Sequence, residues 1–140
     1  MVSYYTLSRT ALKVGLYSYG YSKGQIVLIP DYLCNAITDT LESMGLIVVF
    51  YNLNSRLSPN WESLTRLVKE SNPVALLMVH YFGQPQDISR FQKICRSEKI
   101  LLIEDNAHGF GGYYNKQLLG TFGDIGFSSP RKFQCLSDGG

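Results

Sequence analysis

Short runs of consecutive apolar residues alternate along the chain with segments in which apolar residues recur every three or four positions. The runs lie at residues 25–30, 46–51, 74–79 and 100–103. Because runs of this length have no polar face, they are typical of strands that are covered on both sides, as in the middle of a parallel sheet.

The segments between these runs have helical periodicity and predict helices at residues 32–44, 60–70 and 88–98, with a further helix at 8–19 before the first run. Each connection is long enough to return the chain for a parallel pairing. Four strands separated by three helices therefore predict an α/β fold, a three-layer α/β/α domain with a mostly parallel sheet. Right-handed crossovers place the carboxyl ends of these strands along one edge.

The run at residues 100–103 leads directly into two carboxylates, an amide and an imidazole: Glu104, Asp105, Asn106 and His108. In open α/β sheets, ligands bind in the crevice beyond the carboxyl ends of the strands, so we expect the chemistry of the protein here. The glycine-rich residues 109–117 predict a loop or a loose hairpin, and residues 125–128 predict a last short strand.

The first helix begins with a hydroxyl-rich stretch, Ser8-Arg9-Thr10. One interpretation is a helix cap, in which the hydroxyl of Ser8 or Thr10 accepts a hydrogen bond from a backbone N–H group. Another is an anion site, because the free N–H groups and the dipole at the start of a helix favour a phosphate. The sequence alone leaves both interpretations open.

The 140 residues are 45% hydrophobic and carry a net charge of +2, without a block of either sign. The chain can therefore bury a core, and its charge pattern does not indicate nucleic-acid or membrane binding. No apolar run approaches the roughly 20 residues that a membrane-spanning helix needs. Because no signal peptide is recognisable either, we expect a cytoplasmic protein.

Three cysteines, Cys34, Cys95 and Cys135, lie far apart in the sequence and have no metal-binding spacing. Such cysteines are typical of proteins in a reducing compartment. We expect all three to be buried as small apolar residues, and we expect no metal site.

Asp105 and Lys132 are candidates for cofactor chemistry. A lysine amine forms a Schiff base with an aldehyde cofactor, and a carboxylate held against a pyridine nitrogen keeps that ring protonated and electron-withdrawing. Two other interpretations suit the same residues: a phosphoryl-accepting pocket around Glu104 and Asp105, or a helix-cap cluster with a solvated amine. Spacing alone does not decide between them.

Three motifs occur in order: residues 102–108 (LIEDNAH), residues 120–128 (GTFGDIGFS), and Lys132 followed by residues 137–140 (SDGG). Together with residues 8–11, Pro30 and residues 79–85, this combination resembles the DegT/DnrJ/EryC1/StrS family of sugar aminotransferases. These are pyridoxal-phosphate enzymes of fold type I. The resemblance implies that residues 1–140 are part of the cofactor-binding large domain, without the small C-terminal domain.

By this resemblance, Lys132 is the lysine that binds pyridoxal 5′-phosphate covalently, and Asp105 is the carboxylate paired with its pyridine nitrogen. His108 takes the position near the phenolic oxygen of the cofactor. His80 is a weaker candidate, because a histidine at a strand end can simply bond to the backbone.

The resemblance also implies a phosphate site, formed by Ser128 and by the helix entry of Ser8, Arg9 and Thr10. The chain departs from the family pattern in its spacing, because many members have one more residue before the lysine. Ser128 and Ser129 therefore compete for the same role. Ser137 replaces a glycine of the motif after the lysine, and Cys34 stands where relatives often place an aromatic ring over the cofactor.

The implied reaction is amino transfer to a nucleotide-linked keto sugar, as in polysaccharide biosynthesis, with glutamate as the expected amino donor. Related dehydratases lack the lysine, so Lys132 favours transfer over dehydration. The family also implies a homodimer for the full-length protein. The alternative is a non-catalytic fragment or pseudoenzyme of this family, inactive without a C-terminal part, because relatives are much longer than this chain.

Overall fold

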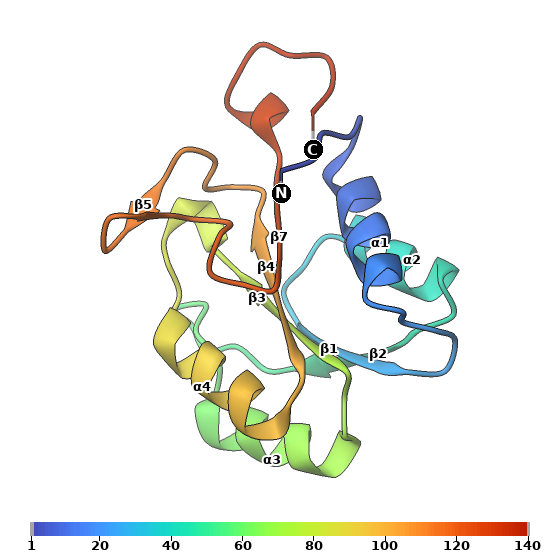
Figure 1. Ribbon diagram of the computed structural model, residues 1–140. Helices are drawn as coiled ribbons and strands as arrows, with labels where there is room; N and C mark the ends of the chain where they lie inside the picture. The colour runs from blue at the N-terminus through green and yellow to red at the C-terminus, as the bar shows by residue number, and fades with distance from the viewer. Residues whose placement is uncertain (1, 140) are drawn as a thin grey trace.

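A five-stranded parallel sheet with strand order β2-β1-β3-β4-β7 forms the centre of the computed structural model, which describes residues 2–139 (Figure 1). Its strands are β1 (Ile26–Pro30), β2 (Ile47–Tyr51), β3 (Ala75–Val79), β4 (Leu101–Asn106) and β7 (Ile125–Ser128). Neighbouring strands pair in parallel throughout. The carboxyl ends therefore lie along one edge, as the sequence predicts.

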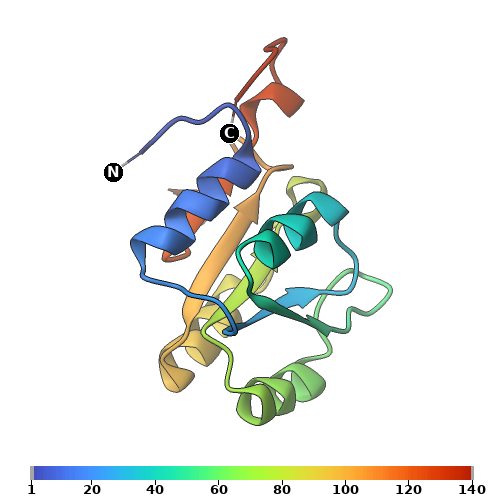
Figure 2. The same cartoon turned by 90° about the vertical axis from the view of Figure 1, so that its right-hand side faces the viewer.

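Two helices cover each face of the sheet, which confirms the predicted three-layer arrangement (Figure 2). On one face lie α1 (Ser8–Ser18) and α2 (Asn35–Ser43), and on the other lie α3 (Trp61–Ser71) and α4 (Ile88–Glu98). Because strand side chains alternate, the odd-numbered core residues of β1, β3, β4 and β7 face α1 and α2, and the even-numbered ones of β1, β3 and β4 face α3 and α4. This alternation places the side chains of Asp105 and Glu104 on opposite faces of the sheet.

Short elements complete the edge where the strands end. A 3₁₀ turn, η1 (Tyr81–Gly83), follows β3, and a second one, η2 (Pro130–Lys132), follows β7. Between β4 and β7, β5 (Tyr113–Tyr114) and β6 (Gln117–Leu118) form an antiparallel hairpin, which confirms the loose hairpin expected in the glycine-rich region.

Three boundaries differ from the sequence prediction. Neither Ser8 nor Thr10 caps α1, because Leu7 is the N-cap residue and no side chain makes the cap bond. The next helix starts at Asn35 rather than 32, since Cys34 is still extended. Finally, β4 continues through its polar residues to Asn106, because they pair with β7.

Two predictions of burial are wrong. The apolar run at 46–51 is not covered on both sides, because β2 is an edge strand in which Ile47 and Phe50 are about half exposed. Of the cysteines, only Cys95 is buried, whereas Cys34 and Cys135 are exposed. No helix within residues 2–139 has the length and the apolar character needed to cross a membrane.

The strand order also locates a crevice. The chain leaves β1 towards β2 on one side, and it later builds β3, β4 and β7 on the other side. In sheets of this kind, ligands bind beyond the carboxyl ends of the two strands at which the order reverses. In this chain that position is the exit of β1 and β3.

Candidate functional site

A cavity of about 400 Å³ lies at this edge of the sheet. It is lined by residues at or just beyond the carboxyl ends of β1, β3, β4 and β7 and by the first turns of α1 and α2. The residues predicted from the sequence that line it are Ser8, Arg9, Asp105, His108 and Lys132, together with the weaker candidate His80. The fold therefore brings the carboxylate and the amine, 27 positions apart in the sequence, to one cavity.

Asp105 lies at the wall of the cavity, between Val79 of β3 and Phe127 of β7. Its side chain is buried, and one carboxylate oxygen, Oδ1, accepts a hydrogen bond of 2.8 Å from the backbone N–H of Ala107. Burial raises the pKa of Asp105 to about 6, against the opposing effects of the Ala107 hydrogen bond, Lys132 and His80. Such a carboxylate gains from a cationic partner in the cavity.

Asp105→Asn is expected to stabilise the folded chain by up to about 3 kcal/mol at pH 8. The substitution replaces a buried carboxylate of the cavity by a neutral amide. The pKa of Asp105 is about 6 in the fold and 3.8 normally, so the native state prefers the protonated form. Stability is therefore lost as pH rises from about 4 to about 6, and it stays low above that. Urea unfolding at pH 4 and pH 8 measures the effect.

The difference between this variant and the wild type should be small at pH 4, where both carry a neutral group. A variant that is less stable than the wild type at pH 8 would show that the ionised carboxylate is well accommodated without a ligand.

Glu104 faces the opposite side of β4 and is fully buried. Its Oε1 accepts hydrogen bonds from His80 Nε2 at 2.8 Å and from the backbone N–H of Gly120 at 2.7 Å. Its Oε2 accepts from the backbone N–H groups of Phe122 at 2.6 Å and Gly123 at 2.9 Å. Although burial alone raises it, these hydrogen bonds lower the pKa of Glu104 overall. Glu104 therefore fixes the loop that leads into β7.

The two adjacent carboxylates do not form one acidic pocket, because the pleat of the strand points them in opposite directions. The sequence-based alternative of a phosphoryl-accepting pocket built from both residues is wrong for this reason. Only Asp105 lines the cavity.

His80 uses both ring nitrogens inside the protein. Its Nε2 donates to Glu104, and its Nδ1 accepts a hydrogen bond of 3.2 Å from the backbone N–H of Gln86. The expected bond to the backbone is thus confirmed, and the bond to Glu104 was not predicted. The contact between His80 and Glu104 is the only close contact between a basic side chain and a carboxylate found within residues 2–139.

His108 lies at the cavity wall, and its ring is stacked on that of Phe82, with ring centres 6.1 Å apart and planes 15° apart. Partial removal from water and the ammonium group of Lys132 lower the pKa of His108. The imidazole is therefore neutral at neutral pH, and it can donate or accept one hydrogen bond at a ligand.

Two predicted phosphate residues are not at the cavity wall. Thr10 is exposed on α1, and Ser128 Oγ accepts a hydrogen bond of 3.2 Å from Asn106 Nδ2. Ser129 is buried, and its Oγ has no hydrogen-bond partner among residues 2–139. Ser8 and Arg9 remain at the wall, where the uncapped start of α1 presents free backbone N–H groups. Gly140, the last residue of the SDGG motif, lies outside the described residues.

Several residues at the wall were not singled out from the sequence: Tyr32, Phe82, Ala107 and Arg131. Each of them follows the end of a strand by a few residues. This position in the sequence is the feature that could have identified them. Cys34, which stands at the position where relatives often place an aromatic ring, also lines the cavity. Tyr32 and Phe82 place exposed aromatic rings nearby.

The cavity suits an aldehyde cofactor with a pyridine ring and a phosphate. It combines a nucleophilic amine at Lys132, a buried acid at Asp105 and an uncapped helix start at Ser8. Within residues 2–139, no cluster of three or more potential ligand residues could hold a metal ion.

Comparison with known proteins supports this chemistry. The sequence profile described as the DegT/DnrJ/EryC1/StrS aminotransferase family matches residues 6–140. A GDP-perosamine synthase of Escherichia coli O157:H7 is 27% identical over 118 residues, which cover 82% of this chain and 32% of that protein. The chain spans about a third of the length of the curated relatives it matches.

Solved structures show the same fold. An aminotransferase of this family from Brucella abortus is 26% identical, with a TM-score of 0.86 over 97% of this chain and 39% of that one. The E. coli GDP-4-keto-6-deoxy-D-mannose-3-dehydratase with bound hydrated pyridoxal phosphate is 27% identical, with a TM-score of 0.80 over 91% of this chain and 34% of that one.

Proposed function

Since the chain belongs to the DegT/DnrJ/EryC1/StrS aminotransferase family, we propose that it forms the cofactor-binding part of an enzyme that uses pyridoxal 5′-phosphate to transfer an amino group to a nucleotide-linked keto sugar. The observation that carries this proposal is the position of Asp105 and Lys132 at one cavity. An acid and an amine around one cavity suit the two ends of the cofactor ring.

When bound, pyridoxal phosphate supplies an electron-withdrawing ring that stabilises negative charge on the substrate carbon. Lys132 Nζ would hold the cofactor covalently, and once the amino donor displaces it, the freed amine would move a proton at that carbon. The carboxylate of Asp105 would accept a hydrogen bond from the pyridine N–H and keep that nitrogen protonated. His108 would bond the phenolic oxygen, and the start of α1 with Ser8 and Arg9 would hold the phosphate.

Lys132 favours transfer over dehydration, and glutamate is the proposed amino donor. We also propose that residues 1–140 belong to a larger cofactor-binding domain, and that the complete protein is a cytoplasmic homodimer. The chain covers about a third of the length of these relatives, which supports the proposal that it belongs to a larger domain.

The same coverage supports a second candidate function, a non-catalytic piece that binds the cofactor but does not turn over. Amino transfer from glutamate to a nucleotide-linked keto sugar, assayed with the 140-residue chain, distinguishes the two. Turnover supports the first candidate, and cofactor binding without turnover supports the second.

Cofactor binding itself is tested by incubating the chain with pyridoxal phosphate, reducing with borohydride and weighing the intact protein. We expect a single saturable addition. Pyridoxal, which lacks the phosphate, should bind roughly 10-fold more weakly or worse, because it loses the charge-assisted hydrogen bonds at the start of α1. Additions that rise without saturation, equally for both compounds, would contradict the proposal. Labelling of Asp105 by acetyl phosphate would instead favour a phosphoryl acceptor.

A further inference from the structure

Phe82 combines an unfavourable backbone with an exposed side chain. Its φ of 54° and ψ of 26° lie in the left-handed region, which costs a bulky residue about 1 kcal/mol or more. Its side chain is 70% exposed, so burial of apolar surface contributes little in return. Strain that burial does not offset is typical of positions where a side chain is placed for function.

The residues on either side hold this turn in place. Tyr81 is buried, and its hydroxyl donates a hydrogen bond of 2.6 Å to the backbone oxygen of Tyr32. Gly83 also has a positive φ, and it packs so closely that a Cβ there would lie 2.8 Å from the backbone oxygen of His108. Phe82 is thereby turned out of the core while its backbone stays next to the segment that carries His108.

We propose that Phe82 is a positioning residue for His108: the left-handed turn lays the phenyl ring beside the imidazole and nearly parallel to it, and so fixes the plane of the imidazole at the cavity wall. The stacking distance of 6.1 Å and the near-parallel planes carry this inference. A fixed imidazole suits contact with the phenolic oxygen of the cofactor, and this part of the inference rests on the proposed function.

The phenyl ring, offset beside the imidazole with ring centres 6.1 Å apart, also takes the place of water next to part of it. The other charged groups around the cavity are Asp105 from β4, Lys132 and Arg131 from η2, and Arg9 from α1. Three of these four groups are cations, and their positive charge disfavours protonation of the His108 imidazole. When the phenyl ring is removed, water can solvate the protonated imidazole. This solvation opposes the effect of the cations and raises the pKa of His108.

The test is NMR of the cofactor-free chain with Phe82→Gly and Phe82→Tyr. Phe82→Gly removes both the ring and the strain, so the melting temperature should stay the same or rise. The ring-proton shifts of His108 should move, and its midpoint of titration should rise. Phe82→Tyr keeps the ring and should restore the wild-type His108 signals. The chain has two histidines, so His108→Gln assigns the signals.

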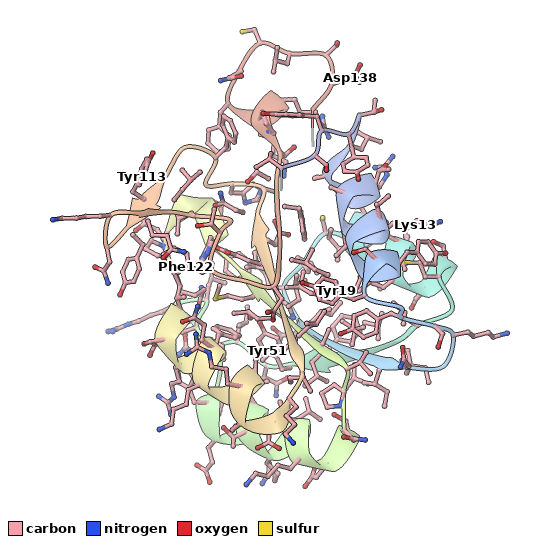
Figure 3. The ribbon with its side chains drawn as sticks, viewed as in Figure 1. Lys13, Tyr19, Tyr51, Tyr113, Phe122 and Asp138 are labelled. Carbon is pink, nitrogen blue, oxygen red and sulfur yellow. The ribbon has the colours of Figure 1, made fainter. Side chains whose placement is uncertain are left out.

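Tyr113→Ala is the matched control. Tyr113 is 68% exposed on β5, it is not one of the residues that line the cavity, and it has no aromatic partner among residues 2–139 (Figure 3). Its removal should leave the His108 signals unchanged. Unchanged His108 signals in Phe82→Gly would overturn the proposal, and so would a drop in melting temperature without any change at His108. Because no cofactor is used, neither result depends on pyridoxal phosphate binding.

Discussion

Lys132→Ala is expected to abolish the borohydride-fixed addition of pyridoxal phosphate, leaving only the slow background of surface lysines. Only an amine forms an imine with the aldehyde carbon that borohydride reduces to a stable bond, and Lys132 is the only lysine at the cavity wall among the described residues. Because its side chain is exposed and forms no ion pair with residues 2–139, the substitution should leave stability within about 0.5 kcal/mol. Intact-mass spectrometry after reduction measures the effect.

Two further variants show whether the loss is specific. Lys132→Arg keeps the positive charge but not the nucleophile, so it should also lose the addition while still binding the cofactor non-covalently. Lys69→Ala removes an exposed lysine of α3, on the other side of the sheet, and should label like the wild type. Wild-type labelling of Lys132→Ala would remove Lys132 from its proposed role.

Glu104→Gln is expected to destabilise the chain by about 3–5 kcal/mol at pH 7. Each carboxylate oxygen of Glu104 accepts two hydrogen bonds, and an amide supplies only one oxygen. The new NH₂ group therefore faces two buried donors, each of which loses its acceptor at a cost of about 1–3 kcal/mol. Urea unfolding measures the change, with Glu70→Gln, an exposed position on α3, as the control.

The pH dependence of this loss has a definite sign. Because the pKa of Glu104 is lowered in the fold, its contribution is present above its ordinary value of 4.5 and is lost as pH falls through the lower folded value. The gap between Glu104→Gln and the wild type should therefore shrink on strong acidification. An equal effect of Glu70→Gln, or a loss below about 1 kcal/mol, would mean that Glu104 does not fix the loop.

The two neighbouring carboxylates illustrate what the sequence could and could not predict. The apolar run before them was enough to place both at the end of a buried strand, and strand alternation places them on opposite faces. That Glu104 meets three backbone N–H groups of a loop 16 to 19 residues later depends on how that loop folds. No local pattern encodes such a tertiary contact.

At the cavity, too, some features could be predicted from the sequence and others depend on the tertiary structure. Strand exits and the resemblance to a family were enough to name Asp105, His108 and Lys132, which the structure brings to one wall. The orientation of Ser128 was missed, because it follows from the register of β7 on β4, which pairs Ser128 with Asn106. The outward turn of Phe82 was missed because it depends on a positive φ that its sequence does not demand.

Asp105 and Lys132 are proposed to hold opposite parts of one pyridine ring. Nitrogen NMR of the chain loaded with pyridoxal phosphate carrying ¹⁵N in the ring tests it most directly. We predict a protonated pyridine nitrogen at pH 8 in the wild type and an unprotonated one in Asp105→Asn, with the cofactor still attached to Lys132. The same nitrogen shift in both proteins would contradict the account.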